Sequence, residues 1–255
     1  MNEVLNVSGY RFVALEQPQL LAPRLKAGAL QRGLRGTILL AHEGINLFLA
    51  GAPGQIAGFL EDLRSVPGLA GFQARQSWSA VQPFRRLLVK VKGEIIRMND
   101  PSLRPAQRAP AVDPATARRW LHQGHDDQGR PLVMLDTRNG FEVDHGGFAG
   151  ALDWRLRKFS DFPQALAAHK AELVGKTVLS FCTGGIRCEK AALHMRACGL
   201  EHVWQLDGGI LRYLEETGGA HFEGNCFVFD EREALDRELA PTKAPPAPVP
   251  AGALP

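Results

Sequence analysis

The segment Phe181–Lys190, FCTGGIRCEK, holds the residues best suited to chemistry. Cys182 follows Thr177–Phe181, an apolar run that predicts a buried strand, and it precedes a helical pattern over Glu189–Cys198. A glycine-rich turn lets backbone N–H groups point at an anion, and the positive end of a helix favours the same charge. Arg187 adds a fixed positive charge. We therefore expect a lowered pKa at Cys182 and a populated, reactive thiolate, rather than an inert buried cysteine.

The spacing of this loop bears on what the cysteine carries. Cys182 and Arg187 are separated by four residues, whereas Cys-dependent phosphatases use five and thereby hold a tetrahedral phosphate. The shorter loop suits a single sulfur or oxygen atom, so phosphatase activity is disfavoured. Thiolate, persulfide and sulfenate remain open as the bound form. The groups expected to cradle the charged atom are those of Thr183, Gly184, Gly185, Ile186 and Arg187.

Three further cysteines follow Cys182 in the last third of the chain. Cys188 is either a second thiol, able to resolve an oxidised Cys182, or a small residue packed beneath the loop, and the second reading is slightly favoured. Cys198 shares a helical face with apolar residues and is expected in the core. Cys226 lies among aromatic and branched residues and is also expected to be buried.

Several polar residues are expected to support the loop. Asp136 and Arg138 follow a buried strand, so they belong at the same sheet end as Cys182, where an ion pair would brace the loop. Glu142 is expected to pair with a base rather than to act as one. His42 and Glu43 are expected to be turn residues, although a contact with RNA or with the catalytic loop is the alternative.

The composition limits the class of protein. The chain has 255 residues, enough for one large or two small domains, and four cysteines that form no disulfide framework. No long apolar run and no basic-then-apolar leader are present, so we expect a cytoplasmic protein with no membrane partner. No cysteine or histidine spacing predicts a metal site, and no glycine pattern predicts a bound dinucleotide.

The positive charge is concentrated in the N-terminal region. Residues 1–99 contain 12 Lys and Arg against 6 Asp and Glu, whereas residues 112–222 contain 13 against 14. This asymmetry suits a polyanion such as RNA, although the same residues could simply solvate a small domain. On the first interpretation, the residues expected to contact RNA are Arg85, Arg86, Lys90, Lys92, Arg155, Arg157 and Lys158.

The order of elements predicts two domains. Residues 1–99 read as β-α-β-β-α-β, the ferredoxin-like pattern of an α+β domain, and a proline-rich linker is expected over residues 100–114. Strands and helices alternate over residues 115–222, which predicts a parallel sheet with helices on both faces. Residues 223–239 are expected to pack on this core as a C-terminal extension. Residues 240–255 are rich in proline and are expected to be disordered.

Three segments of the second region resemble the rhodanese family. They are Asp136–Glu142, the loop Cys182–Arg187, where rhodanese-like proteins carry a cysteine that becomes a persulfide, and Leu206–Ile210. This resemblance implies a rhodanese-like α/β fold for the catalytic domain.

A longer set of strings resembles one subfamily, the bacterial tRNA uridine hydroxylases. The strings are His42–Asn46, Asp136–Glu142, Phe159–Pro163, Phe181–Lys190 and Gly224–Asp230. Together these segments extend the resemblance over roughly residues 7–235. Some members carry a cysteine-rich extension after the last of these segments. This chain continues into its proline-rich tail instead, so no metal site is expected there.

The resemblance implies an enzyme that hydroxylates the wobble uridine of tRNA at C5, giving 5-hydroxyuridine. It implies Cys182 as the essential residue, molecular oxygen as co-substrate, an unidentified reductant, and the anticodon arm of tRNA, not DNA, as partner. A rhodanese-type sulfurtransferase carrying a persulfide on Cys182 is the alternative. A non-enzymatic RNA-binding or sulfide-sensing module is a third reading, which the intact cysteine, glycines and arginine disfavour.

Overall fold

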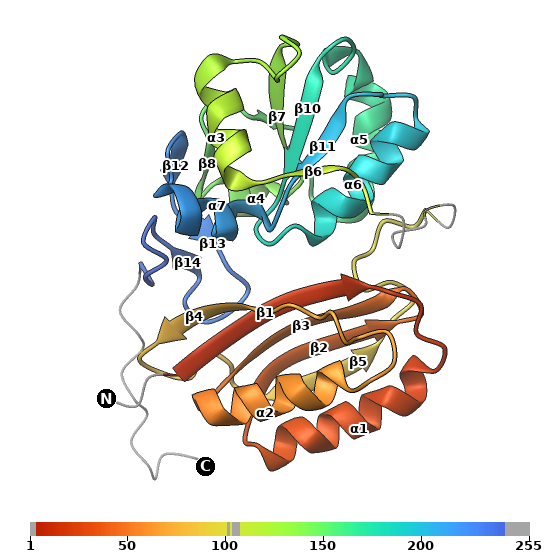
Figure 1. The fold of residues 1–255 in the computed structure, drawn as a ribbon, viewed down its shortest axis with the longest axis vertical. Coiled ribbons are helices and arrows are strands. Elements are labelled where there is room, and N and C mark those ends of the chain that lie inside the picture. Colours follow the sequence, from red (N-terminus) through yellow and green to blue (C-terminus); the bar gives the residue numbers. More distant parts are fainter. Residues whose placement is uncertain (1–3, 101–102, 104–107, 243–255) are drawn as a thin grey trace.

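The α+β domain and the α/β domain lie one above the other in a computed structural model, which describes residues 4–100, 103 and 108–242 (Figure 1). The first domain contains β1 (Val4–Phe12), α1 (Pro18–Gln31), β2 (Arg35–Ala41), β3 (Gly44–Gly51), α2 (Pro53–Arg64), β4 (Arg75–Ser79) and β5 (Leu87–Val91). The strand order is β4-β1-β3-β2-β5, so the first four strands have the ferredoxin-like arrangement, and β5 adds a parallel edge strand beside β2. The predicted α+β domain is therefore confirmed.

Helices α1 and α2 cover one face of this first sheet, and the other face is turned toward the second domain (Figure 1). Helix α2 forms because apolar residues recur at helical spacing, at Ile56, Phe59, Leu60 and Leu63, and all four are buried in the core. The uncovered face of the sheet is what allows strand β1 to contribute to a site between the domains.

The second domain is built on a parallel sheet of order β6-β11-β10-β7-β9. Its elements are β6 (Ala111–Val112), α3 (Pro114–Gln123), β7 (Leu132–Asp136), α4 (Gly140–Val143), β8 (Gly146–Phe148), β9 (Leu152–Asp153), η2 (Phe159–Asp161), α5 (Phe162–His169), η3 (Lys170–Glu172), β10 (Thr177–Phe181), α6 (Ile186–Ala197), β11 (Val203–Leu206) and α7 (Gly209–Thr217). Helices α3 and α7 lie on one face of the sheet, and α5 and α6 lie on the other (Figure 1). Each pair of helices packs on a separate apolar cluster. The predicted parallel sheet with two covered faces is confirmed.

The segment after α7 connects the two domains. It contains β12 (Phe222–Gly224), which pairs with β8, and the small hairpin of β13 (Cys226–Phe227) and β14 (Ala234–Leu235). The hairpin lies near β4 of the first domain (Figure 1). Arg232 donates a hydrogen bond from Nη1 to Ser77 Oγ at 2.9 Å, which joins this segment to β4. The described start of the proline-rich tail also pairs back, since Thr242 N–H donates to Ala234 O; residues 243–255 lie outside the described residues.

Two predictions about this fold are wrong in detail. Part of the expected linker belongs to the second sheet, because Ala111–Val112 pair with β11 and Ala109 is buried in the core; residues 101, 102 and 104–107 lie outside the described residues. Cys198 is exposed rather than buried. It is the C-cap residue of α6, at an exposed end of the helix, whereas Ala191 and Met195 of the same helix lie in the core.

Candidate active site

A cleft of about 1150 Å³ lies between the two domains. The ends of β7, β10 and β11 meet on one side of it, because the carboxyl ends of parallel strands share one edge of a sheet. Strands β1, β3 and β4 of the first domain and the segment around Phe229 line much of the remainder, together with loops of both domains. Cys182, the residue that follows β10, opens onto this cleft although its side chain is only 1% exposed.

The sulfur of Cys182 sits in a cradle of donors. The Gly185 N–H donates to it at 3.1 Å, and the Arg187 and Cys188 N–H groups also point at it. Helix α6 begins at Ile186, three residues earlier than the sequence pattern predicts, because Gly185 adopts a left-handed φ of 101° at the N-cap. The N–H groups of the first helical turn are thereby aimed at the sulfur.

These contacts decide the ionisation of Cys182. Burial alone would raise the pKa of its thiol, but the hydrogen bond from the Cys188 thiol, the charge of Arg187 and the two backbone N–H groups hold the pKa well below its ordinary value. The interaction between the two thiols has the opposite effect on the pKa of Cys188. Burial and the hydrogen bond to Cys182 raise the pKa of Cys188 well above its ordinary value, so Cys188 stays a thiol.

The lowered pKa gives a pH prediction. As the pH falls from 9 to 7, Cys182 should remain a thiolate, whereas a free cysteine peptide, with a pKa of about 8.5, should lose most of its thiolate. The measurement is the ultraviolet thiolate absorbance of the wild type minus that of Cys182→Ser. A difference that titrates together with the free peptide would contradict the prediction.

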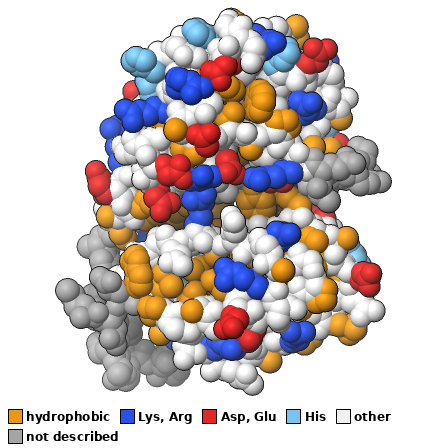
Figure 2. All heavy atoms as spheres, viewed as in Figure 1, with side chains coloured by type: hydrophobic (Ala, Val, Ile, Leu, Met, Phe, Trp, Pro, Cys, Tyr) orange, Lys and Arg blue, Asp and Glu red, His pale blue; other side chains and the backbone are white. Residues whose placement is uncertain are grey.

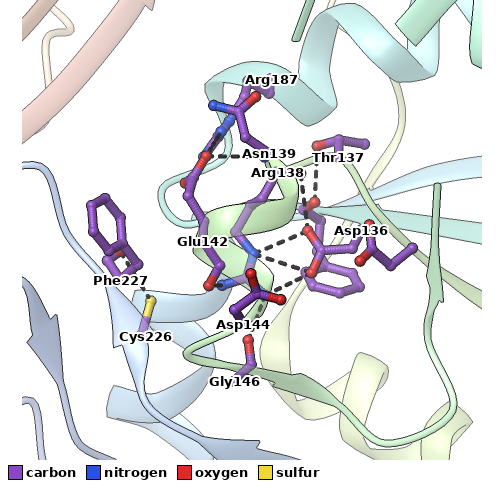
Figure 3. Close-up of polar contacts among 12 residues, drawn as sticks. Asp136, Thr137, Arg138, Asn139, Glu142, Asp144, Gly146, Arg187, Cys226 and Phe227 are labelled. Carbon is purple, nitrogen blue, oxygen red and sulfur yellow. Dashed lines mark hydrogen bonds and ion pairs between the residues drawn. The ribbon is translucent and has the colours of Figure 1, made fainter. Parts of the chain in front are cut away.

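Arg187 is the base with which Glu142 pairs, in agreement with the expectation that Glu142 would pair with a base. Its guanidinium forms a bidentate pair with Glu142, at 2.5 Å from Nη1 to Oε1 and 2.8 Å from Nη2 to Oε2, and Glu142 is fully buried (Figure 3). Arg138 pairs in the same region with Asp136, at 2.6 Å between Nη2 and Oδ2, and donates to Gly146 O at 2.7 Å (Figure 3). The Glu142–Arg187 pair holds the segment after β7 against the catalytic loop, and the bonds of Arg138 stabilise that segment itself. The Arg187 charge still acts on Cys182.

Two polar atoms at the cleft lack a partner. Thr183 Oγ1 and Asn139 Oδ1 are buried and accept or donate no hydrogen bond among the described residues, although the Asn139 side chain faces the Glu142 N–H in a capping-box arrangement. Both residues line the cleft. A buried polar atom without a partner costs free energy, and this cost falls when a ligand supplies the bond. Asn139 was not singled out by its sequence, because its only signal is its place within the segment Asp136–Glu142.

The first domain reaches the catalytic loop through Tyr10 of β1. Its hydroxyl donates to Glu189 Oε2 at 2.8 Å. A Cβ atom at Gly185 would lie only 3.0 Å from the same hydroxyl oxygen, so the N-cap of α6 and the tyrosine are in close contact. Burial first, and then the charge of Glu189, raise the pKa of Tyr10 well above its ordinary value, which keeps the hydroxyl protonated beside the site.

A buried lysine joins the domains at the same helix. Lys190 of α6 is 2% exposed, and its Nζ lies 2.8 Å from Glu43 Oε2 and 2.6 Å from Glu94 Oε2, both in the first domain. The expectation that Glu43 serves only as a turn residue is therefore wrong, since its other oxygen also accepts from the Ile95 N–H. His42 bonds locally, between Nδ1 and Leu15 O.

The charged lining of the cleft differs from the predicted RNA contacts. Of the seven residues predicted, all of them described, Lys158 lines the cleft, whereas the other six lie outside its lining. The described lining contains eight Lys and Arg against four Asp and Glu, and Figure 2 shows such side chains gathered along the boundary between the domains. The basic lining residues that sequence reasoning missed are Arg11, Arg75, Arg97, Arg108, Arg212 and Arg232.

Neither a metal cluster nor a membrane helix is found in the described part of the chain. No group of three or more His, Cys, Asp or Glu among those residues is arranged to hold a metal ion. No helix there is long and apolar enough to cross a membrane.

One family model and several solved structures are similar to parts of this chain. A family model described as the UPF0176 acylphosphatase like domain matches residues 4–95. Among solved structures, a rhodanese-like domain from Anabaena matches with a TM-score of 0.37 and 20% identity, covering 46% of this chain and 80% of that one. An acylphosphatase from Coxiella burnetii matches with a TM-score of 0.27 and 20% identity, covering 35% of this chain and 94% of that one.

Curated relatives match nearly the whole chain. A protein named tRNA uridine(34) hydroxylase from Bordetella pertussis is 62% identical over 242 residues, which cover 94% of this chain and 99% of the relative. Proteins of the same name from Variovorax paradoxus and Cupriavidus necator are 58% and 55% identical, over 94% of this chain in both cases and over 92% and 85% of their own lengths. With such identity over both domains, the chain belongs to the tRNA uridine(34) hydroxylase family.

Proposed function

We propose that this enzyme hydroxylates uridine 34 of tRNA, the wobble position, at C5 of the base to give 5-hydroxyuridine. The observation that carries the proposal is the 62% identity, across both domains, to a relative named for this reaction. The geometry supports it, because an activated cysteine faces a cleft in whose lining Lys and Arg outnumber Asp and Glu. Since tRNA is the substrate, we place the enzyme in the bacterial cytoplasm.

The anticodon arm binds across the boundary of the two domains, and only the target nucleotide enters the cleft. A volume of about 1150 Å³ is slightly above the range of small-ligand pockets, roughly 300–1,000 Å³, and far below that of a stem-loop. Bases of an anticodon loop are unpaired, so one of them can be turned out at modest cost. Phe229, which is 52% exposed and lines the cleft, offers a face on which a base can stack.

The two unpartnered oxygens suit the edge of a uracil ring. Uracil presents one N–H donor between two carbonyl acceptors. Asn139 Oδ1 can accept from the N–H, and the Thr183 hydroxyl can donate to a carbonyl. Binding would then satisfy both protein atoms and the base, next to the Cys182 sulfur.

Molecular oxygen is the co-substrate in this proposal. One oxygen atom enters the C5–H bond and the other leaves as water, which requires two electrons and two protons. The role of Cys182 as the essential thiolate agrees with its lowered pKa.

The experiment is nucleoside mass spectrometry of tRNA from a strain that lacks the gene and any second route to this nucleoside. Complementation with the wild type should restore 5-hydroxyuridine, and Cys182→Ser should not. If the deletion leaves 5-hydroxyuridine unchanged, the proposal fails. Sulfur transfer to cyanide that requires Cys182, with no 5-hydroxyuridine formed, would establish the sulfurtransferase alternative instead.

Charge reversal at the cleft tests where tRNA binds. Lys158→Glu and Arg97→Glu should each weaken tRNA binding about tenfold and lower the slope of log Kd against log salt by about 1, because each removes a phosphate contact. Lys92→Glu is the matched control, since Lys92 is exposed but outside the lining. A filter-binding titration at several salt concentrations measures all three. An equal loss with Lys92→Glu would place the RNA along β5, as the sequence analysis predicted.

A further inference from the structure

We propose that Cys182 and Cys188 form a redox pair that supplies the two electrons of hydroxylation and closes to a disulfide in each turnover. This inference rests on the hydroxylase function proposed above and identifies its immediate reductant.

The two sulfur atoms lie at one end of α6. Cys182 lies just before the helix, with its sulfur at the helix N-terminus, and Cys188 is in the first helical turn. Cys188 is fully buried, and its sulfur lies 3.9 Å from the Thr137 hydroxyl. The same hydroxyl donates to the Phe181 carbonyl at 2.9 Å, so Thr137 links the Cys188 sulfur to the residue that precedes Cys182. The lowered pKa of Cys182 and the raised pKa of Cys188 each have the other thiol among their causes. The fold thus brings both cysteines to the N-terminal end of one helix, where the proposed disulfide would form.

The protonation of the pair suits dithiol chemistry. Cys182 is held as a thiolate, and Cys188 remains a thiol that shares its proton with it. A thiolate that faces a protonated thiol is the arrangement from which a disulfide forms, because the thiolate is the attacking group. This arrangement requires a second cysteine beside Cys182, and Cys188 supplies it.

The other two cysteines are placed differently. Cys198 lies ten residues beyond Cys188 at the far end of α6, a separation of about 15 Å along a helix. Cys226 lies in β13 of the C-terminal segment, and its thiol faces the Phe227 carbonyl at 3.8 Å. Of the four cysteines, all of which the structure describes, Cys188 is the one in the first turn of α6, at the helix end that holds the Cys182 sulfur.

The reaction balances with this pair as reductant. Uridine, one molecule of oxygen, the Cys182 thiolate, the Cys188 thiol and one proton from the solvent give 5-hydroxyuridine, one molecule of water and one disulfide. The C5–H bond of the base is replaced by a C5–OH bond, and the second oxygen atom takes the Cys188 proton and the solvent proton and becomes water. The base loses two electrons and the two sulfurs lose two, and together these four reduce oxygen fully. A cellular thiol reductant then reopens the disulfide for the next turnover.

A single-turnover experiment tests this stoichiometry. The full-length enzyme is reduced, freed of reductant, mixed without oxygen with excess unmodified tRNA, and then exposed to oxygen in the presence of catalase. We expect about one 5-hydroxyuridine per enzyme molecule, together with a peptide that joins Cys182 to Cys188. Samples without tRNA should keep both thiols, and added dithiothreitol should restore multiple turnovers.

Cys188→Ser distinguishes a redox role from a packing role. It should bind tRNA like the wild type but give less than about a tenth of the product without reductant. Excess dithiothreitol should restore product, because an external thiol can take the place of Cys188; a packing defect would not be rescued in this way. Cys198→Ser is the matched control and should give one product per enzyme molecule.

Three outcomes would overturn the inference. One is wild-type yield from Cys188→Ser without reductant, and another is product from the wild type with both thiols intact. The third is a pre-reduced enzyme that forms no product although its gene restores 5-hydroxyuridine in cells, since the electrons would then come from elsewhere. Only a deletion strain that keeps its 5-hydroxyuridine would refute the proposed function itself.

Discussion

Cys182→Ser should lower the rate of uridine hydroxylation by a factor on the order of 10³ or more, because a hydroxyl in the same cradle does not ionise near neutral pH. The substitution replaces one atom of a side chain that is only 1% exposed, so the fold and the tRNA-binding surface should be unchanged. The measurement is product per minute by nucleoside mass spectrometry, beside a tRNA binding titration.

The matched control for this loss is Cys198→Ser, which changes an exposed cysteine on the same helix. It should leave both the rate and the affinity unchanged. A Cys182→Ser enzyme that keeps a tenth or more of the wild-type rate would show that the cysteine is not the reacting group.

Glu142→Gln should lower the free energy of unfolding by about 3 kcal/mol, because it leaves the buried Arg187 without its counter-charge. The glutamine has the same shape and can still accept one hydrogen bond, so the loss reports on the charge rather than on the volume. The positive charge that faces Cys182 would no longer be offset, so the thiolate should be retained while stability falls. Urea unfolding and the thiolate absorbance measure the two effects separately.

Asp144→Asn provides the comparison for Glu142→Gln. Asp144 forms an ion pair with Arg155 at the end of the same short helix, but both side chains are more than half exposed. Its substitution should leave the urea midpoint unchanged, since exposed ion pairs contribute little. Equal losses from the two substitutions would contradict the importance assigned to burial of the Glu142 pair.

The features that depend on residues close together in the sequence could be predicted from the sequence alone. The strand before Cys182 and the glycines after it define a strand, loop and helix within a few residues, so the cradle could be expected without a structure. The ferredoxin-like domain was likewise predictable, because its strands and helices each carry their own apolar period. The exact start of α6 was missed, since it depends on the left-handed conformation of Gly185 rather than on apolar spacing.

The parts that depend on contacts between the domains could not be predicted. Arg97 and Arg108 lie in the cleft because of how the second domain packs on β1, and nothing in their local sequence distinguishes them from Arg85 or Lys90. Glu43 looked like an ordinary turn residue, because its partner Lys190 is far away in the sequence. Charge counts indicated a basic region, but only the fold shows which charges face the site.

The buried Lys190 has a consequence for how the molecule holds together as a thermodynamic unit. Cutting the chain between its domains would separate Lys190 from Glu43 and Glu94, and both fragments would lose the ion pairs that join them. Each half is therefore less stable alone than within the whole chain, and the two halves should melt in one cooperative transition. The helix that carries the reactive loop thus holds its position only while the neighbouring domain stays folded.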